Sequence, residues 1–181
     1  MLDTLGNFVL FQLGWFACVW GAASGHPDLG PIVVLAILAL HFGLLREKRG
    51  EAQTILAVGV LGSLVECGML AARVYRPAVA PLWGWVCPLF LVALWFLFAF
   101  ALNGCLRWLQ GRLGLAALFG LVGGPLSYGA GERLGAIRFN DDRLYAAAAM
   151  GLVWGAMTPL VLWIARALKE RAGAEKPLSG R

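Results

Sequence analysis

The side chain best suited to chemistry in this chain is Glu66, a carboxylate inside a long apolar segment. A carboxylate within the hydrocarbon region is costly, and it usually faces the interior of a helix bundle or water. Arg73 follows seven residues later, near the same helical face. Two interpretations of Glu66 stay open: an acid/base or cation-binding group, and a polar clamp that holds helices together.

A second set of polar residues lies in the segment 124–136, which is rich in glycine and contains Pro125. Proline removes a helical hydrogen-bond donor, and an interrupted membrane helix often borders a cavity. Glu66 and Arg73 are expected at a similar depth. We predict one polar pocket that opens toward the outer leaflet, although a packed kink with an interfacial salt bridge weighs more from sequence alone. The polar members of the segment are Tyr128, Glu132 and Arg133.

A third set lies near the expected inner end of the fourth apolar segment. Asn103 and Arg107 share a helical face with Trp95 at a spacing of four residues. Asn103 is expected to form a hydrogen bond to another helix. For Arg107, a contact with a phosphate and a plain interfacial anchor are equally good interpretations. His41 is expected to be a structural group that pairs with Asn103 or Gln12.

Patterns that hold metals or cofactors are lacking in the sequence. The four cysteines show no C-x-x-C spacing, and the two histidines have no carboxylate at ligand spacing. The chain also lacks a nucleotide-binding glycine loop, a G-x-S-x-G elbow and an H-E-x-x-H motif. We therefore predict no metal and no cofactor, and we interpret the cysteines as small buried hydrophobic residues.

Long apolar runs separated by short polar turns must position these side chains. The chain has 181 residues, of which 60% are hydrophobic and 14% are charged, against about 25% charged residues in ordinary soluble domains. About 20 apolar residues cross a membrane as a helix. We therefore predict an all-α bundle of six transmembrane helices in a single domain, residues 1–168, followed by a basic, disordered cytoplasmic tail, residues 169–181. The helices are expected at Leu5–Ser24, Leu29–Leu45, Ala52–Tyr75, Leu82–Leu109, Leu113–Gly131 and Leu144–Leu168.

The distribution of basic residues predicts the orientation. Placing both termini inside gives ten Lys and Arg residues on the cytoplasmic side and five on the outer side, as positively charged inner loops require. This distribution explains the net charge of +5 better than a nucleic-acid partner does. Small residues also recur at a spacing of four, as in Gly120 and Gly124. Helix packing within one chain is the favoured interpretation, and a homodimer face is the alternative.

Three segments together, residues 7–18, 94–109 and 124–136, are similar to a bacterial domain-of-unknown-function family of small six-helix inner-membrane proteins. The patterns are L-W-x-x-F-x-x-x-L-N-x-x-L-R-W-L and G-P-L-x-Y-x-x-G-x-R-L-G-A. Relatives usually have Asn-His-Ser where this chain has Asn103, Gly104 and Cys105, and often Asp in place of Glu66. The family is often encoded near cyclopropane-fatty-acid-synthase-like methyltransferases. The resemblance implies a multi-pass inner-membrane location and a role in lipid modification or in the response to membrane damage.

The leading hypothesis is a protein that binds or handles a lipid-like molecule. Arg73 and Arg133 would hold an anionic head group, and Glu66 or Tyr128 would act on the ligand or orient it. Further ligand contacts are assigned to Glu132, Asn103 and Arg107. The alternatives are a small transporter or flippase in which Glu66 titrates, and a non-catalytic scaffold that docks a lipid-modifying enzyme on its basic cytoplasmic face or binds anionic lipids there.

Overall fold

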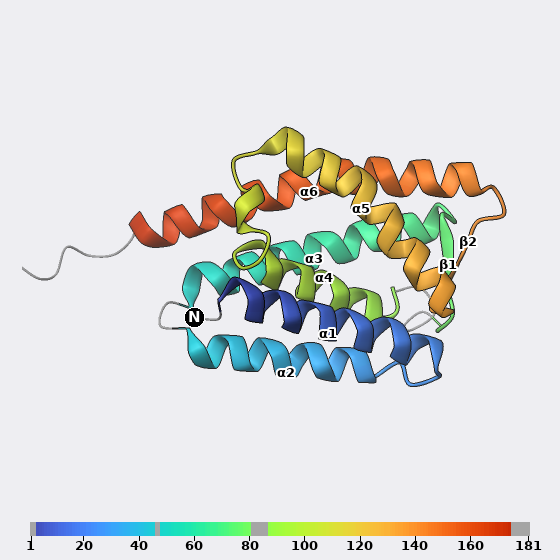
Figure 1. The fold of residues 1–181 in the computed structure, drawn as a ribbon, viewed down its shortest axis with the longest axis horizontal. Coiled ribbons are helices and arrows are strands. Elements are labelled where there is room, and N and C mark those ends of the chain that lie inside the picture. The colour runs from blue at the N-terminus through green and yellow to red at the C-terminus, as the bar shows by residue number, and fades with distance from the viewer. Residues whose placement is uncertain (1–2, 46–47, 81–86, 175–181) are drawn as a thin grey trace, which may run out of the picture.

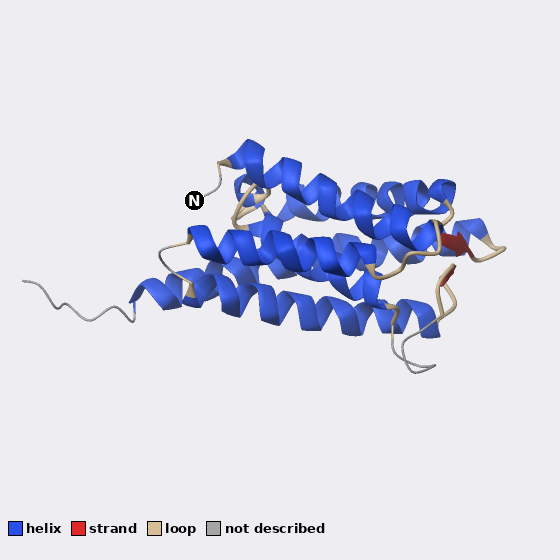
Figure 2. Ribbon diagram, turned by 90° about the horizontal axis from the view of Figure 1, so that it is seen from below, coloured by secondary structure: helices blue, strands red, loops and turns tan. Residues whose placement is uncertain are grey.

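In the computed structural model, the described residues are 3–45, 48–80 and 87–174, and they contain six α-helices (Figure 1). A short 3-10 helix follows α4, and two short strands pair at one end of the bundle (Figure 2). The two strands come from distant parts of the chain and pair antiparallel, as the strands of a hairpin do. We therefore call this end of the bundle the hairpin end, and the opposite end the N-terminal end. The elements are α1 Thr4–Ala23, α2 Leu29–Leu44, α3 Arg49–Ala71, β1 Tyr75–Pro77, α4 Leu89–Leu102, the 3-10 helix Arg107–Leu109, α5 Leu113–Leu134, β2 Ile137–Phe139 and α6 Arg143–Ala174.

Helix α4 is the central element of the bundle. It is apolar on every face, and it packs against α1, α2, α3 and α6. A helix with that composition is stable when it is surrounded by other helices. The prediction of a helix from Leu82 to Leu109 is wrong at its end, because the helix stops at Leu102 and the 3-10 turn follows. Residues 82–86 lie outside the described part.

Four of the helices, α1, α3, α5 and α6, are long and apolar enough to cross a membrane. Their outward faces carry large apolar side chains, such as Leu64, Leu126 and Leu152, which are 65%, 68% and 70% exposed. The other two helices are shorter, with 16 residues in α2 and 14 in α4. Helix α6 continues six residues beyond its predicted end at Leu168.

Helices α3 and α5 end in the same way. Each terminates at a residue with a left-handed backbone, Arg73 (φ 55°) and Gly135 (φ 88°). The next N–H then reaches back to the last turn: Val74 donates to the Met69 carbonyl at 3.0 Å and Ala136 donates to that of Gly131 at 2.9 Å. This motif closes a helix and releases the chain in a new direction.

The two released segments form the antiparallel strands β1 and β2, which the sequence did not predict. Tyr75 pairs with Phe139, and Arg76 lies directly opposite Arg138. The strands join the end of α3 to the end of α5, which are far apart in sequence. They lie at the hairpin end of the bundle (Figure 2), where Tyr75 and Ile137 are part of the buried core.

The predicted small-residue contacts between helices are present within the chain. A Cβ atom at Gly120 would overlap the backbone carbonyl of Trp154, and one at Gly124 would lie 2.5 Å from the Trp154 ring. Helices α5 and α6 therefore approach closely along this stripe, as the glycine spacing predicts.

Candidate functional site

The centre of the candidate site is the carboxylate of Glu66, which is 1% exposed. Its Oε2 accepts a hydrogen bond from the indole N–H of Trp95 at 2.7 Å. Its Oε1 accepts one from the hydroxyl of Tyr75. The Tyr128 hydroxyl lies 2.8 Å from both oxygens. The carboxylate therefore joins α3, α4, α5 and β1 through three donors.

All three donors are neutral side chains, which distinguishes the cluster from an ion pair. Among the described residues, no Lys or Arg forms a salt bridge with Glu66. Burial raises the pKa of the Tyr75 phenol well above its ordinary value, and the neighbouring Glu66 raises it further. Tyr75 consequently remains a hydrogen-bond donor across the physiological pH range. Burial likewise raises the pKa of the nearby Cys87 thiol, which makes that thiol a poor nucleophile.

The structure brings Glu66 and Tyr128 together, as the sequence predicts, and adds two partners that sequence reasoning did not assign. Tyr75 lies in a strand that was expected to be the end of a helix. Trp95 also fills a contact between helices, because its ring stacks on that of Trp154 with ring centroids 4.7 Å apart. The sequence feature that could have identified Tyr75 is its hydroxyl-bearing aromatic side chain, nine residues after the membrane carboxylate Glu66.

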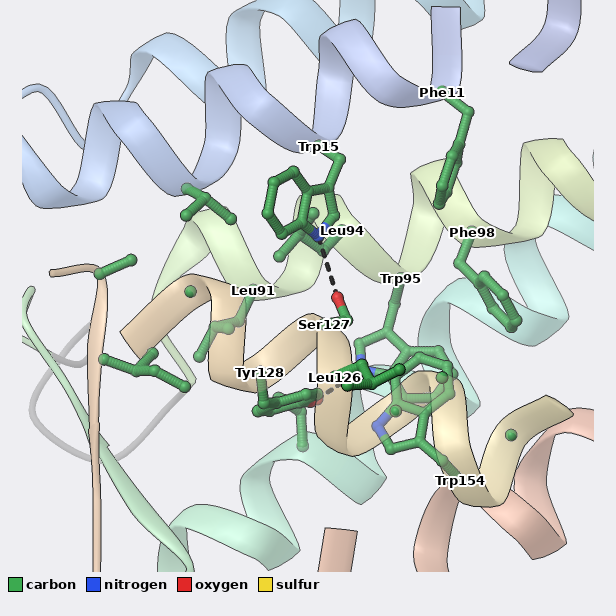
Figure 3. Close-up of a pocket in the computed structure, with 18 of the residues that line it drawn as sticks. Phe11, Trp15, Leu91, Leu94, Trp95, Phe98, Leu126, Ser127, Tyr128 and Trp154 are labelled. Carbon is green, nitrogen blue, oxygen red and sulfur yellow. Dashed lines mark hydrogen bonds between the residues drawn. The ribbon is translucent and has the colours of Figure 1, made fainter. Parts of the chain in front are cut away.

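A cavity of about 410 Å³ lies beside this cluster, between α1, α4, α5 and α6 (Figure 3). Its lining is mostly apolar and aromatic, and Glu66 and Tyr128 form part of its wall. Along α5 the lining runs from Phe119 to Gly131, which corresponds to about 18 Å of helix. The cavity is therefore an elongated chamber with one polar wall.

The cavity opens on the flank of the bundle, between α1 and α5. Gln12, Phe119 and Leu126 line it and are exposed at its rim. Helix α5 runs diagonally and approaches α1 toward the hairpin end (Figure 1). One polar bridge spans the opening, where the indole N–H of Trp15 donates to the Ser127 hydroxyl at 3.1 Å, and Figure 3 shows this bond crossing from α1 to α5.

Pro125 lies inside α5, which is one continuous helix and not an interrupted one. This part of α5 does border the cavity, because Gly124, Ser127 and Tyr128 line it. The other charged residues predicted for this pocket are not among its described lining. Glu132 accepts from the Phe139 N–H at 2.9 Å and pairs with Arg143 at 2.5 Å.

Arg73 and Arg133 are both exposed near the hairpin end. The backbone of Arg73 terminates α3, and its carbonyl accepts from the Asn140 amide at 2.7 Å. The structure does not place these arginines with Glu66, because both side chains are exposed and neither is part of the described cavity lining.

A second polar cluster lies at the N-terminal end. Glu51 accepts from the Asn103 amide at 2.9 Å and lies 3.1 Å from the ring of His41. Gln110 donates to the Asn103 amide oxygen at 3.0 Å. Asn103 therefore bonds to another helix as predicted, whereas His41 pairs with Glu51 instead of Asn103 or Gln12. Arg107 is exposed on the 3-10 helix and no longer continues the face of Trp95, because α4 has ended.

Glu51 was missed because the sequence placed it in a polar turn before the third helix. The sequence did contain an indication of such a residue, because His41 and Asn103 were both expected at the inner end without an assigned acidic partner. Among the described residues, no group of three or more His, Cys, Asp or Glu side chains is arranged to hold a metal ion.

The fold and the site define a helical protein with at least four helices apolar enough to cross a membrane, arranged around a buried carboxylate and a laterally open apolar cavity. Residues 4–160 match the sequence profile of a family described as proteins of unknown function (DUF2878), and the chain belongs to that family. No match was found among curated proteins or among solved structures.

Proposed function

We propose that this protein binds a lipid-like molecule in the flank cavity, as a six-span protein of the bacterial inner membrane with both termini in the cytoplasm. The observation that carries the proposal is the position of the cavity, which is apolar, elongated and open between α1 and α5 instead of at an end of the bundle. In a bilayer this opening faces the acyl chains, so a hydrophobic ligand enters without crossing water.

The charge distribution supports this orientation. Among the described residues, seven Lys and Arg side chains lie toward the N-terminal end and five toward the hairpin end. More positive charge at the N-terminal end favours its cytoplasmic placement. The cavity extends to Ala136 and Ile137 beside the hairpin, so its polar wall lies in the outer half of the membrane.

Filling the cavity tests the proposal. Gly123 lines the cavity, and a Cβ atom there would meet only the Phe119 ring, at 3.9 Å or more. Gly123→Leu therefore places a side chain in the cavity without a backbone clash. Gly129→Leu is the matched control, because it lies on the same helix, outside the described lining, and its Cβ would meet nothing within 4 Å.

The measurement is the lipid that copurifies with each protein, extracted and quantified by mass spectrometry. We expect a lipid species at near-stoichiometric amounts with wild type and Gly129→Leu, and its loss with a folded Gly123→Leu. Equal lipid content in all three proteins, after correction for detergent-bound bulk lipid, would show that the cavity is not the binding site.

The role of the carboxylate is tested separately with Glu66→Gln in a deletion strain. The amide oxygen of the new side chain accepts from Trp95, while the hydroxyls of Tyr75 and Tyr128 turn to accept from the amide nitrogen. The variant therefore keeps the shape of the cluster. If a lipid species that disappears on deletion is restored by wild type but not by stably expressed Glu66→Gln, the acid is part of the lipid chemistry or transport. Full restoration by Glu66→Gln assigns the acid a purely structural role.

A further inference from the structure

The carboxyl group in the cavity wall has no positive partner among the described residues. The described lining includes Glu66 and no Lys, Arg or His. The three groups that contact the carboxyl group, Tyr75, Trp95 and Tyr128, are neutral donors. An ionised carboxylate only accepts hydrogen bonds, so it can satisfy all three donors at once. Because buried charges in proteins are normally paired, the ionised form still calls for a countercharge.

Aromatic side chains make up a large share of the cavity wall. Eight of the 22 described lining residues, about 36%, are aromatic, against 12% of the whole chain. Next to Glu66, the rings of Trp95 and Trp154 stack with centroids 4.7 Å apart, and Tyr128 meets Trp154 with centroids 6.2 Å apart. The faces of aromatic rings are negative and attract cations. The carboxyl group and the rings beside it therefore favour the same sign of charge in a ligand.

The hydrogen bonds of Glu66 restrict the kind of cation. Its oxygens already accept from three donors, and the side chain is 1% exposed. A primary ammonium would bring three N–H groups that need acceptors, and a buried donor without an acceptor is costly. A quaternary ammonium has no N–H group. It is attracted by the charge of Glu66 and by the ring faces without forming a hydrogen bond to either.

The position of Glu66 along α3 suits a charged head group. Glu66 lies five residues before the end of α3 at Ala71, which is about 7.5 Å of helix. The cavity reaches Ala136 and Ile137 beside the hairpin, and it extends along α5 to Phe119. A cationic head group near Glu66 would stay close to the membrane surface, where a charge costs less than at the bilayer centre. The chain of the same ligand would lie along the apolar remainder of the cavity.

We infer that the ligand is a lipid-like cation: an apolar chain that carries a quaternary ammonium group, held beside Glu66 and the aromatic rings next to it. This inference rests on the proposed function and names the chemical class of the ligand. It departs from the expectation that arginines hold an anionic head group, because Arg73 and Arg133 lie outside the described lining.

The test measures the binding of four radiolabelled probes to the full-length protein in dodecyl maltoside micelles by scintillation proximity. Each probe has a hexadecyl chain. The probes are hexadecyltrimethylammonium, its neutral isostere in which carbon replaces the nitrogen, hexadecylammonium and hexadecanesulfonate. We expect the quaternary cation to bind at least about tenfold more tightly than the neutral and anionic probes, which corresponds to about 1.4 kcal/mol. We also expect it to bind severalfold more tightly than hexadecylammonium.

Two variants connect that preference to the buried carboxyl group. Glu66→Gln keeps the shape of the cluster and removes the acid. The preference for the quaternary cation over its neutral isostere should therefore fall severalfold, while binding of the isostere stays within about twofold. Asp141→Asn is the matched control, because Asp141 is an exposed acid at the hairpin end and outside the described lining, and it should leave the preference unchanged. If Glu66→Gln does not fold, the four probes on wild type still decide.

Four results would overturn the inference: binding of the neutral isostere within twofold of the cation, equal or tighter binding of hexadecanesulfonate or hexadecylammonium, an unchanged preference in a folded Glu66→Gln, or an equal loss of preference in Asp141→Asn. The failure of the proposed function is a distinct result, in which Gly123→Leu binds all four probes as well as wild type does.

Discussion

Each of the two tyrosines that contact Glu66 should be able to replace the hydrogen bond of the other when one of them is removed. A double-mutant cycle measures the resulting coupling energy. In the structure, Oε1 has Tyr75 and Tyr128 as donors, while Oε2 has Trp95 and Tyr128. A hydroxyl has one proton, so Tyr128 serves one oxygen at a time. In Tyr75→Phe the proton of Tyr128 goes to Oε1, and in Tyr128→Phe the oxygens keep Tyr75 and Trp95.

Each single variant therefore leaves both oxygens with a donor. We expect a loss of about 0.6–1.5 kcal/mol in the free energy of unfolding, the usual net value of one hydrogen bond. The double variant leaves Oε1 buried without a donor, which adds the penalty of an unsatisfied buried group, about 1–3 kcal/mol. The double loss should thus exceed the sum of the single losses by about 1–3 kcal/mol.

The assay is reversible unfolding in mixed micelles, followed by tryptophan fluorescence. A control cycle pairs Tyr75→Phe with Thr54→Val, whose hydroxyl bonds to the Gly50 carbonyl at the other end of α3. Thr54 lies about 18 Å along α3 from Glu66, the acceptor of the Tyr75 hydrogen bond, so the two losses should add. A coupling energy near zero between Tyr75 and Tyr128 would refute the shared-acceptor arrangement around Glu66.

Three further predictions concern stability and use the same unfolding measurement. Gly120→Ala should lower the free energy of unfolding by about 1–3 kcal/mol, because the new methyl group overlaps the Trp154 carbonyl. Gly68→Ala, which has open space around it, should raise that free energy by up to about 1 kcal/mol. Equal effects of the two substitutions would contradict the close contact of α5 and α6. Arg73→Gly should gain about 1 kcal/mol because φ is 55° at this position, and a loss would mean that its side chain holds the hairpin. Glu51→Ala should lose about 2–3 kcal/mol because it unpairs two buried groups at the N-terminal end, and a loss below about 0.5 kcal/mol would make that cluster energetically unimportant.

The long apolar runs predicted six of the six α-helices in the described residues, because length and hydrophobicity are local properties of the sequence. The ends of the helices were harder to predict. The sequence carries Tyr75 and Leu109 in or beside apolar stretches, yet α3 stops at Ala71 and α4 at Leu102. These ends depend on pairing between β1 and β2 and on the cluster around Glu51, which are contacts between distant parts of the chain.

In the candidate site, too, the sequence predicted the features that are local and missed those that depend on contacts between distant parts of the chain. The cost of a membrane carboxylate made Glu66 conspicuous, and the glycine- and proline-rich segment 124–136 pointed to Tyr128 and to a cavity, although α5 is continuous through Pro125. The rotation of each helix about its axis is not encoded by spacing alone, so the sequence could not show that Arg73 and Arg133 lie outside the described cavity lining.

The way in which Glu66 is satisfied bears on what the cavity does. A buried carboxylate that is paired with an arginine would present a fixed charge pair to a ligand, whereas three neutral donors give each oxygen at least one hydrogen bond and add no positive charge. The hydrogen bonds of the polar wall are then complete before any ligand enters, and they contribute rigidity at the junction of α3, α4, α5 and β1.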